Sequence, residues 1–472
     1  MRSFSIFFLL FATYFSFAQD KQMTQEIDQN AELYKSIAQQ IWANPELGYQ
    51  ETASSALLQK TLKDAGFSIK TGVAGIPTAF VAEFGSGAPV IAVLAEFDAL
   101  PGTSQQAVAY KAPVTEGGAG HACGHHLFGT ASVAAGISIK NWLQKTKTPG
   151  TIRVYGTPAE EGGAGKVYMV RAGLFEDVDT VLHWHPNDQN EANASSSLAN
   201  KSAKFRFYGV ASHAAGAPER GRSALDAVEA MNYMTNLLRE HVPQETRIHY
   251  VITSGGEAPN VVPAFAEVFY YVRNPDVANV KSIFERIVKA AEAAALGTGT
   301  EMKYEVIHGL YNLLPNETLS RVMFDNLQKV GGIQYTDVER EFARKIAASF
   351  NIETNIDDAS KISPFVVQEK GTGGSTDVGD VSWQVPTAGL GTATWVPGTS
   401  AHTWQAVAAG GTSIGQKGML NAAKAIALTA AELYKNPDII KKAKEELATR
   451  RGNNAAYEAL IGDREPPLDY RN

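Results

Sequence analysis

A nearly uninterrupted apolar run, Pro89–Phe97, constrains the fold of this chain most strongly. A run without polar alternation is typical of a strand that is covered on both faces in a parallel sheet. Similar strand patterns at Thr78–Phe84, Thr151–Tyr155 and Thr180–Trp184 are separated by helix patterns such as Leu127–Leu143. Strands that alternate with helices predict an α/β fold with helices on both faces of the sheet. In such sheets, ligands bind beyond the carboxyl ends of the strands.

The 472 residues are too many for one compact core, so two or three domains are expected. From Lys201 to His308 the patterns follow the order β-α-β-β-α-β. That order predicts a small α+β domain of ferredoxin-like type. We therefore expect a larger domain over 19–200 and 309–472, interrupted by a smaller domain over 201–308. The polar tail beyond Gly452 is expected to pack loosely.

The N-terminus has the pattern of a signal peptide. Arg2 precedes an apolar run, Phe4–Phe17, which ends at the small residue Ala18. The run is shorter than the roughly 20 residues of a membrane span, and no cysteine follows it to carry a lipid. We expect residues 1–18 to be removed and the protein to be periplasmic or secreted, without a membrane anchor. A buried N-terminal helix is the alternative.

Charge and cysteine content narrow the possible functions. The net charge is −7 and no stretch is rich in Lys and Arg, so nucleic acid is not an expected partner. Cys123 is the single cysteine, which rules out a disulfide within the chain. A lone thiol is a liability in an oxidising compartment unless something occupies it, and a metal ion would do so.

Cys123 lies among histidines, in the segment His121–His126. A thiolate and an imidazole two positions apart, as in Cys123 and His125, can face one ion when a glycine permits a tight turn between them. The alternative is a buried cysteine beside histidines at the start of a helix.

Two adjacent carboxylates, Glu160 and Glu161, follow the strand pattern Thr151–Tyr155. Adjacent side chains there point to different sides, so one carboxylate can bind a metal while the other acts as a general base. An exposed acidic turn is the alternative.

Further candidate ligands stand in other loops. We expect one imidazole of His183 and His185 to reach a metal and the other to be structural, with the two rings on opposite faces of the strand. His402, which is distant in sequence, gains weight only by joining the other ligands. Asp98, at a strand end, could bind a metal or orient a ligand imidazole.

Together, one thiolate, several imidazoles and a glutamate pair form a borderline-soft donor set. This set favours Zn²⁺ or Mn²⁺ over Ca²⁺. Two such ions roughly 3.5–4 Å apart can activate a water and polarise a carbonyl.

The chain resembles the family of metal-dependent amidohydrolases and peptidases that includes the hippurate and N-acyl-amino-acid hydrolases. The likeness covers nearly the whole mature chain, and it looks greatest to the aminobenzoyl-glutamate hydrolases. It rests on Phe97–Pro101, His121–His125, Pro158–Gly163, His183–Pro186, Ala211–Ala215, Pro259–Val262, Ser375–Trp383 and His402–Gln405.

The resemblance implies a metal-dependent aminopeptidase-like catalytic domain that holds two divalent ions and hydrolyses a small-molecule amide. Glu160 would act as the general base toward a metal-activated water, and Asp98 would lie behind the ligands. The implied ligands are Cys123 as the bridge, Glu161 and His402 at one ion, and His125 and His183 at the other.

The resemblance also makes the inserted domain a lid that dimerises, as a homodimer or as a heterodimer with a related subunit. His213 would stabilise the charge that develops on the substrate, because an imidazole N–H can hold an oxyanion. Asn260 and Arg273 would bind the carboxylate of the amino-acid part.

The chain departs from the family pattern at His126, Glu96 and Thr376, which leaves substrate selectivity open. A dipeptidase or carboxypeptidase would use the same metals, and a non-catalytic binding protein with the same fold is a further alternative.

Overall fold

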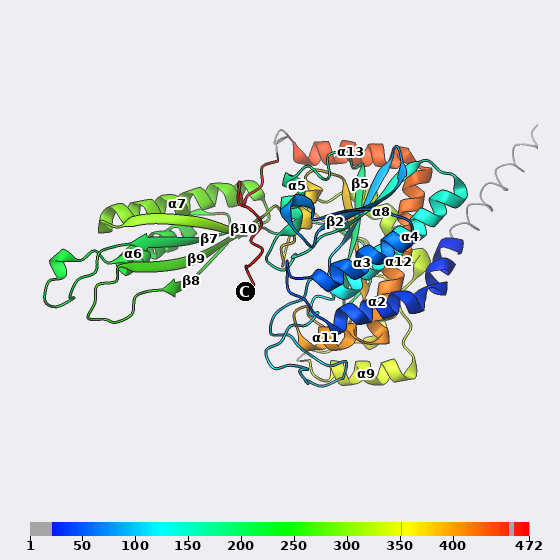
Figure 1. Ribbon diagram of the computed structural model, residues 1–472, viewed down its shortest axis with the longest axis horizontal. Helices are drawn as coiled ribbons and strands as arrows, with labels where there is room; N and C mark the ends of the chain where they lie inside the picture. Colours follow the sequence, from blue (N-terminus) through cyan, green and yellow to red (C-terminus); the bar gives the residue numbers. More distant parts are fainter. Residues whose placement is uncertain (1–20, 351, 453–456, 472) are drawn as a thin grey trace, which may run out of the picture.

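The computed structural model describes residues 21–350, 352–452 and 457–471 (Figure 1). The expected signal peptide, residues 1–18, lies outside the described residues. Within the described residues, no helix combines the length and the apolar character needed to cross a bilayer.

A six-stranded sheet forms the centre of the larger domain, with strand order β1-β2-β4-β3-β5-β12. The strands β4, β3, β5 and β12 are parallel, while β1 and β2 pair antiparallel at one edge. The strands are β1 (Ser68–Thr71), β2 (Phe80–Ser86), β3 (Val90–Ala95), β4 (Gly150–Gly156), β5 (Thr180–Asn187) and β12 (Thr387–Ala393).

Strand β3 is buried on both faces, as the apolar run predicts. Ile91 and Val93 belong to the core on one face, whereas Ala92 and Leu94 belong to the core on the other. The α/β class with helices on both faces is therefore confirmed. The first face is covered by α2 (Ala31–Ala43), α3 (Thr52–Asp64), α4 (His125–Thr146), α8 (Glu317–Val330), α12 (Ser413–Lys435) and α13 (Pro437–Arg451), and the second by α5 (Gly165–Arg171) and α10 (Val378–Ser382).

The inserted domain projects from the larger one as a separate lobe (Figure 1). Its antiparallel sheet has the order β10-β7-β9-β8, and two helices pack on that sheet around a core of their own. This is the predicted β-α-β-β-α-β order. The elements are β7 (Ala199–Tyr208), α6 (Ala224–Leu238), β8 (Arg247–Ser254), β9 (Phe265–Asn274), α7 (Val277–Thr298) and β10 (Glu301–Leu310). We call this lobe the lid.

Shorter elements complete the larger domain. A two-stranded sheet joins β6 (Ala194–Ser195) to β11 (Val367–Gln368), next to the end of β5. Helices α9 (Asp337–Ala347) and α11 (Trp404–Gly410) lie at the end of the domain away from α13 (Figure 1).

The C-terminal tail is packed rather than loose, so that expectation is wrong for its described part, residues 457–471. Tyr457 donates to the buried Asp380 at 2.8 Å, and Ile461 joins the core beneath α5. Arg464 donates to the main-chain oxygens of Val306 and Ile307 on the lid strand β10. Aromatic and charged side chains spaced along a polar segment fix it to both domains.

Candidate metal centre

The loop that carries Cys123 turns sharply into helix α4. Gly124 has a φ of 77°, and a Cβ placed on it would lie 2.6 Å from the Cβ of Pro186. Only glycine fits both the left-handed conformation and the close approach. Helix α4 starts at His125, and the loop therefore places the sulfur and this imidazole at the carboxyl end of the sheet.

Asp98, just beyond the end of β3, fixes two of the predicted ligands. Its Oδ1 lies 2.9 Å from Nδ1 of His125, and its Oδ2 accepts the main-chain N–H of Glu161 at 2.8 Å. The side chain is 1% exposed. One carboxylate thus orients the ring of His125 and the loop of Glu161 at the same time, as expected of a residue behind the ligands.

The Glu160–Glu161 loop is held in a strained conformation. Ala159 has a φ of 57°, and its N–H donates to the buried carboxylate of Glu51 at 2.8 Å. On the other side of the loop, Tyr49 donates to the main-chain oxygen of Gly163 at 2.7 Å. These buried contacts stabilise a turn that would be costly in isolation.

His402 reaches the same place from a distant part of the chain. Its main-chain N–H donates to the oxygen of Ala122 at 2.9 Å, which ties its turn to the Cys123 loop. Its Nε2 lies 3.1 Å from Oε1 of Glu161. The fold thus brings His402 to the candidate site, although a single distant histidine is weak evidence for a metal ligand in the sequence.

The structure brings His185, and not His183, to the cysteine. His185 Nε2 lies 3.5 Å from Cys123 Sγ, and its Nδ1 lies 2.7 Å from the main-chain oxygen of Pro186. The choice of His183 as a ligand is therefore corrected. The expectation that the two rings point to opposite faces is also wrong, because strand residues two apart share a face.

His183 lies one step back along β5. A Cβ on Gly389 of the neighbouring strand would lie 2.3 Å from Nε2 of His183, so the ring covers that glycine. Burial, His185 and Lys166 lower the pKa of His183 to about 3, and the ring is therefore neutral at ordinary pH.

Three groups of potential ligand atoms converge, and within each group the atoms lie within 4.8 Å of one another. One of these groups shares Cys123 with the second and His125 with the third, which makes all three parts of one centre. They are Cys123, His125 and His185; Cys123, Glu161 and His402; and Glu96, His125 and Glu160.

The donor set fits divalent ions. Nε2 of His125 lies 3.2 Å from Oε2 of Glu96, and Oε1 of Glu161 lies 3.1 Å from a ring nitrogen of His402. These three buried atoms of His125, Glu96 and Glu161 nevertheless form no hydrogen bond of acceptable geometry. Buried polar atoms are seldom left this way, so their convergence on one space indicates a cation. A thiolate with imidazoles and carboxylates suits a borderline-soft ion.

The protonation states depend on the same groups. Burial raises the pKa of the Cys123 thiol, which needs a bound cation to become a thiolate. Burial also favours a neutral Glu161, but His402 and His125 outweigh it and lower the pKa of Glu161 to about 2. His402 in turn has a raised pKa because of its contact with Glu161.

Glu160 differs from its neighbour. Burial, and then the negative charges of Glu96 and Glu161, raise its pKa well above the ordinary value. A carboxylate of raised pKa beside a metal centre can both take and return a proton.

Sequence reasoning missed a buried ion group behind Glu160. Lys166, which is fully buried, lies 2.6 Å from Glu96 and 2.7 Å from Asp377. The main-chain N–H of Lys166 also donates to Asp377. Asp377 belongs to a segment on which the family likeness rests. Its partner Lys166, six residues after Glu160, belongs to no motif that the sequence analysis could use.

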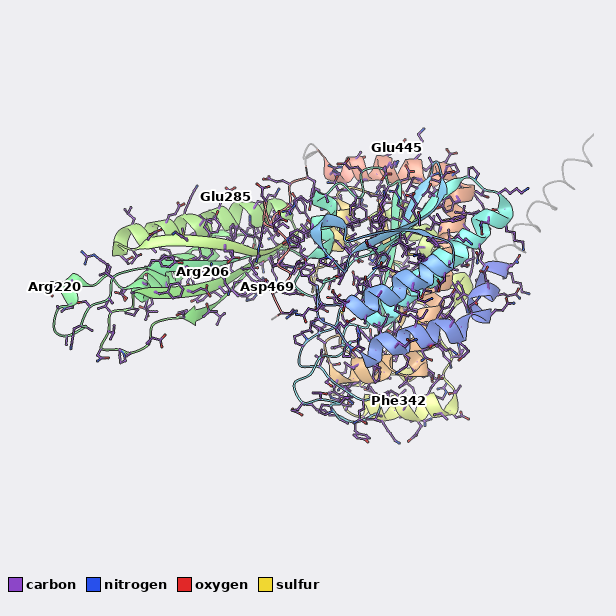
Figure 2. All side chains as sticks on the ribbon, in the orientation of Figure 1. Arg206, Arg220, Glu285, Phe342, Glu445 and Asp469 are labelled. Atoms are coloured by element: carbon purple, nitrogen blue, oxygen red, sulfur yellow. The ribbon has the colours of Figure 1, made fainter. Side chains whose placement is uncertain are left out.

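The predicted lid residues do not join the centre within one chain. His213 and Asn260 lie together, since Ala214 donates to the main-chain oxygen of Asn260 at 3.0 Å. Their loops lie at the far tip of the lid, where Figure 2 labels Arg220. Arg273 lies near the other end of strand β9, about 27 Å along the strand from Phe265, where β9 begins.

Comparison with known proteins gives matches to the lid and to nearly the whole chain. Residues 199–298 match the model of the M20 peptidase dimerisation domain. The chain is 42% identical over 446 residues to a subunit of the p-aminobenzoyl-glutamate hydrolase of Escherichia coli K12, covering 89% of this chain and 93% of that protein. It is 31% identical to the mouse Xaa-Arg dipeptidase, covering 90% and 91% of the two chains.

Among solved structures, a dinuclear metal-binding peptidase of the M20 family from Bacillus subtilis superposes with a TM-score of 0.57 at 17% identity. The match covers 88% of this chain and 99% of that one. At this identity the likeness shows a shared fold.

Proposed function

We propose, from the premise that this chain belongs to the M20 family of metal-dependent amidohydrolases and peptidases, that its substrate is an N-acyl amino acid of the aminobenzoyl-glutamate kind. The observation that carries the proposal is the convergence of one sulfur, three imidazoles and three carboxylates on one space. The 42% identity over nearly the whole chain supports the substrate class.

Two divalent ions, Zn²⁺ or Mn²⁺, are the proposed cofactors. Cys123, Glu161 and His402 would hold one ion, and Cys123, His125 and His185 the other. Such a pair polarises the amide carbonyl and makes a water nucleophilic at neutral pH.

Glu160 is the proposed general base. Its carboxylate lies beside the centre without belonging to the two cysteine-containing groups. It takes the proton of the attacking water and returns it to the amine that leaves. Lys166, Glu96 and Asp377 fix the surroundings of this carboxylate, and so its proton affinity.

A dipeptidase function is the second candidate, because the mouse relative is a named Xaa-Arg dipeptidase. It fits less well, since identity to that relative is 31% and identity to the aminobenzoyl-glutamate enzyme is 42%. A non-catalytic role does not fit a chain in which every predicted donor type is present and converges.

The protein is also proposed to be an exported oligomer. The pattern of residues 1–18 supports a periplasmic or secreted location. The match of the lid to a dimerisation domain supports pairing, with itself or with a related chain, since two relatives from E. coli are named as different subunits of one hydrolase.

The test is a substrate panel assayed with added Zn²⁺ or Mn²⁺. It should contain 4-aminobenzoyl-glutamate, benzoyl-glutamate, other N-acyl amino acids and dipeptides that end in arginine. We expect metal-dependent release of glutamate and the highest kcat/KM on the aroyl-glutamates. Higher kcat/KM on the dipeptides would favour the second candidate, and no turnover of any amide would refute the proposal.

A further inference from the structure

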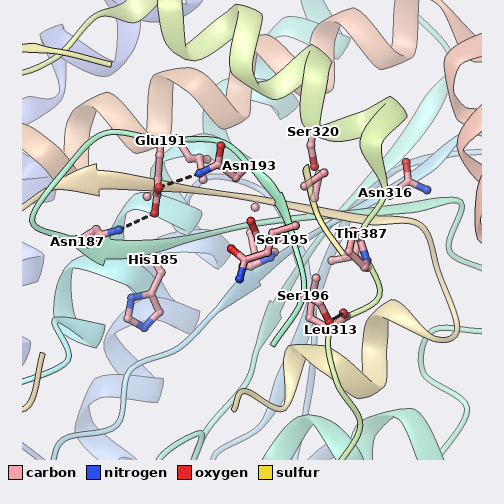
Figure 3. Close-up of a pocket in the computed structure, with 18 of the residues that line it drawn as sticks. His185, Asn187, Glu191, Asn193, Ser195, Ser196, Leu313, Asn316, Ser320 and Thr387 are labelled. Carbon is pink, nitrogen blue, oxygen red and sulfur yellow. Dashed lines mark hydrogen bonds between the residues drawn. The ribbon is translucent and has the colours of Figure 1, made fainter. Parts of the chain in front are cut away.

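A cavity of about 340 Å³ is lined in part by strand β5, which carries His185 (Figure 3). His185, which faces Cys123, also lines this cavity. His183 and Asn187 line it from the same strand, because residues two apart on β5 share a face. Whatever binds in the cavity therefore lies next to the bond that the metal centre would cleave.

Glu191 stands in this cavity with both carboxylate oxygens partly occupied (Figure 3). Its Oε1 accepts from Asn187 Nδ2 at 3.0 Å, and its Oε2 accepts from Asn193 Nδ2 at 2.8 Å. A carboxylate oxygen has two acceptor positions, so each oxygen can accept a further hydrogen bond.

Main-chain contacts set the orientation of the two amides. Oδ1 of Asn187 accepts the N–H of Asp188 at 2.7 Å, and Oδ1 of Asn193 accepts the N–H of Val366 at 2.9 Å. Both amide nitrogens must then point toward Glu191. Two side-chain amides and two main-chain groups thus hold one carboxylate in a defined place.

Within the described part of the chain, no Lys or Arg lines the cavity, and the groups that act on the Glu191 carboxylate are Asp188, Asn187 and Asn193. The amino-acid part of an N-acyl amino acid carries a carboxylate, which Glu191 would repel. The acyl part carries no such charge. The cavity therefore suits the acyl arm of the substrate and excludes the amino-acid arm.

The position of Glu191 suits the far end of that arm. Glu191 pairs with Gly391 of β12, and Gly391 pairs with His185 of β5. Two strand spacings separate the main chains of Glu191 and His185 by roughly 10 Å. The carboxylate of Glu191 reaches back from there to Asn187, two residues beyond His185 on β5. It is therefore placed beyond His185, where a donor at the end of an acyl group can reach it.

We propose that this cavity is the acyl subsite and that Glu191 selects acyl arms that carry an N–H donor, such as an aromatic amine. The inference rests on the proposed function and deepens it, because it names the residue that distinguishes an aminobenzoyl group from a benzoyl group. Asn187 and Asn193 are positioning residues for that carboxylate.

The test compares 4-aminobenzoyl-glutamate with benzoyl-glutamate in the metal-loaded full chain and in Glu191→Gln. The wild-type protein should prefer the amino compound in kcat/KM, mainly through KM. Replacing the charged acceptor by a neutral amide, which has only one acceptor oxygen, should reduce that preference about tenfold in the variant. Because both substrates are compared in each protein, a general effect of the substitution on the rate does not change the preference.

Asp188→Asn is the matched control. Asp188 also carries a carboxylate near Glu191 but does not line the cavity. This variant should keep the wild-type preference. An equal preference in wild-type protein and Glu191→Gln, with both substrates cleaved, would overturn the subsite and leave the proposed function standing.

A binding experiment decides the inference even if neither amide is cleaved. Calorimetric titration with 4-aminobenzamide and benzamide measures recognition of the acyl arm without turnover. The amino compound should bind more tightly to the wild-type protein, and the difference should be smaller in Glu191→Gln. Equal binding of the two compounds to the wild-type protein would refute the role of Glu191.

Discussion

At the scale of single residues, the geometry of the metal centre depends on buried side chains that hydrogen-bond to the candidate ligands or pair with them. Asp98 divides its two oxygens between the ring of His125 and the main chain of Glu161. Lys166 joins Glu96 to Asp377 in a space with no water access. A buried lysine is tolerated only where such charges surround it, and here they also surround Glu160.

Glu160→Gln should retain the metal and lose about 10²–10⁴-fold in kcat, because an amide cannot accept the proton of the attacking water. Metal content by elemental analysis and kcat on an aroyl-glutamate are the two measurements. The adjacent Glu161→Gln is the control, since it should lose metal as well as activity. Undiminished kcat in Glu160→Gln would remove that residue from the mechanism.

His185→Ala and His183→Ala form a matched pair on one strand. The first should lose one ion per chain, because His185 faces Cys123. The second should keep the full metal content, since its ring covers Gly389 instead. Elemental analysis after dialysis distinguishes them, and the opposite outcome would restore His183 as the ligand.

At the scale of elements, the C-terminal tail acts on a loop that lies 309 positions before it in the sequence. Tyr470 and Arg471 both donate to the main-chain oxygen of Glu161, at 3.0 and 2.5 Å. The ring of Tyr470 also packs edge-on against the ring of Tyr49, at a centroid distance of 5.6 Å. Tyr49 in turn donates a hydrogen bond to the same loop. Figure 2 places Asp469 between the lid and the larger domain.

A double variant, Tyr470→Phe with Arg471→Ala, should weaken metal binding about tenfold, because residues that orient a ligand affect affinity on that scale. Calorimetric titration of the metal-free protein with Zn²⁺ measures this. Arg464→Gln is the control: it loosens the tail at the lid strand and leaves the oxygen of Glu161 held. Equal Zn²⁺ affinity in the double variant and the wild-type protein would show that the tail does not position the loop.

At the scale of the whole molecule, the lid extends away from the centre of its own chain (Figure 1). His213 and Asn260 are at its far tip, and exposed apolar side chains such as Val251 and Ile252 lie on the edge strand β8. If His213 assists catalysis, a second chain must supply it or the lid must turn through a large angle. The dimerisation match favours a second chain.

Mixing two inactive variants tests this arrangement. Glu160→Gln and His213→Ala, refolded or exchanged together, should recover part of the wild-type rate. In the mixed dimer, one centre would have an intact Glu160 and receive an intact His213 from the other chain. Each variant alone should stay nearly inactive. Absence of recovery, with mixed dimers demonstrated by mass spectrometry, would contradict catalysis across the interface.

The sequence alone determined the layered α/β domain, the inserted lid order and most of the ligand types. Those features depend on local patterns: the apolar run of β3, the period of the helices, and the glycine turn after Cys123. Their information lies in residues close together in the chain, which is where pattern arguments have force.

Only the tertiary structure decided which groups meet. The register of β5 against the Cys123 loop selects His185 over His183, although both lie on the same face. Lys166, Glu191 and the final tyrosine and arginine of the tail acquire roles through contacts between segments far apart in sequence. No local pattern specifies such contacts, because they depend on how whole elements pack.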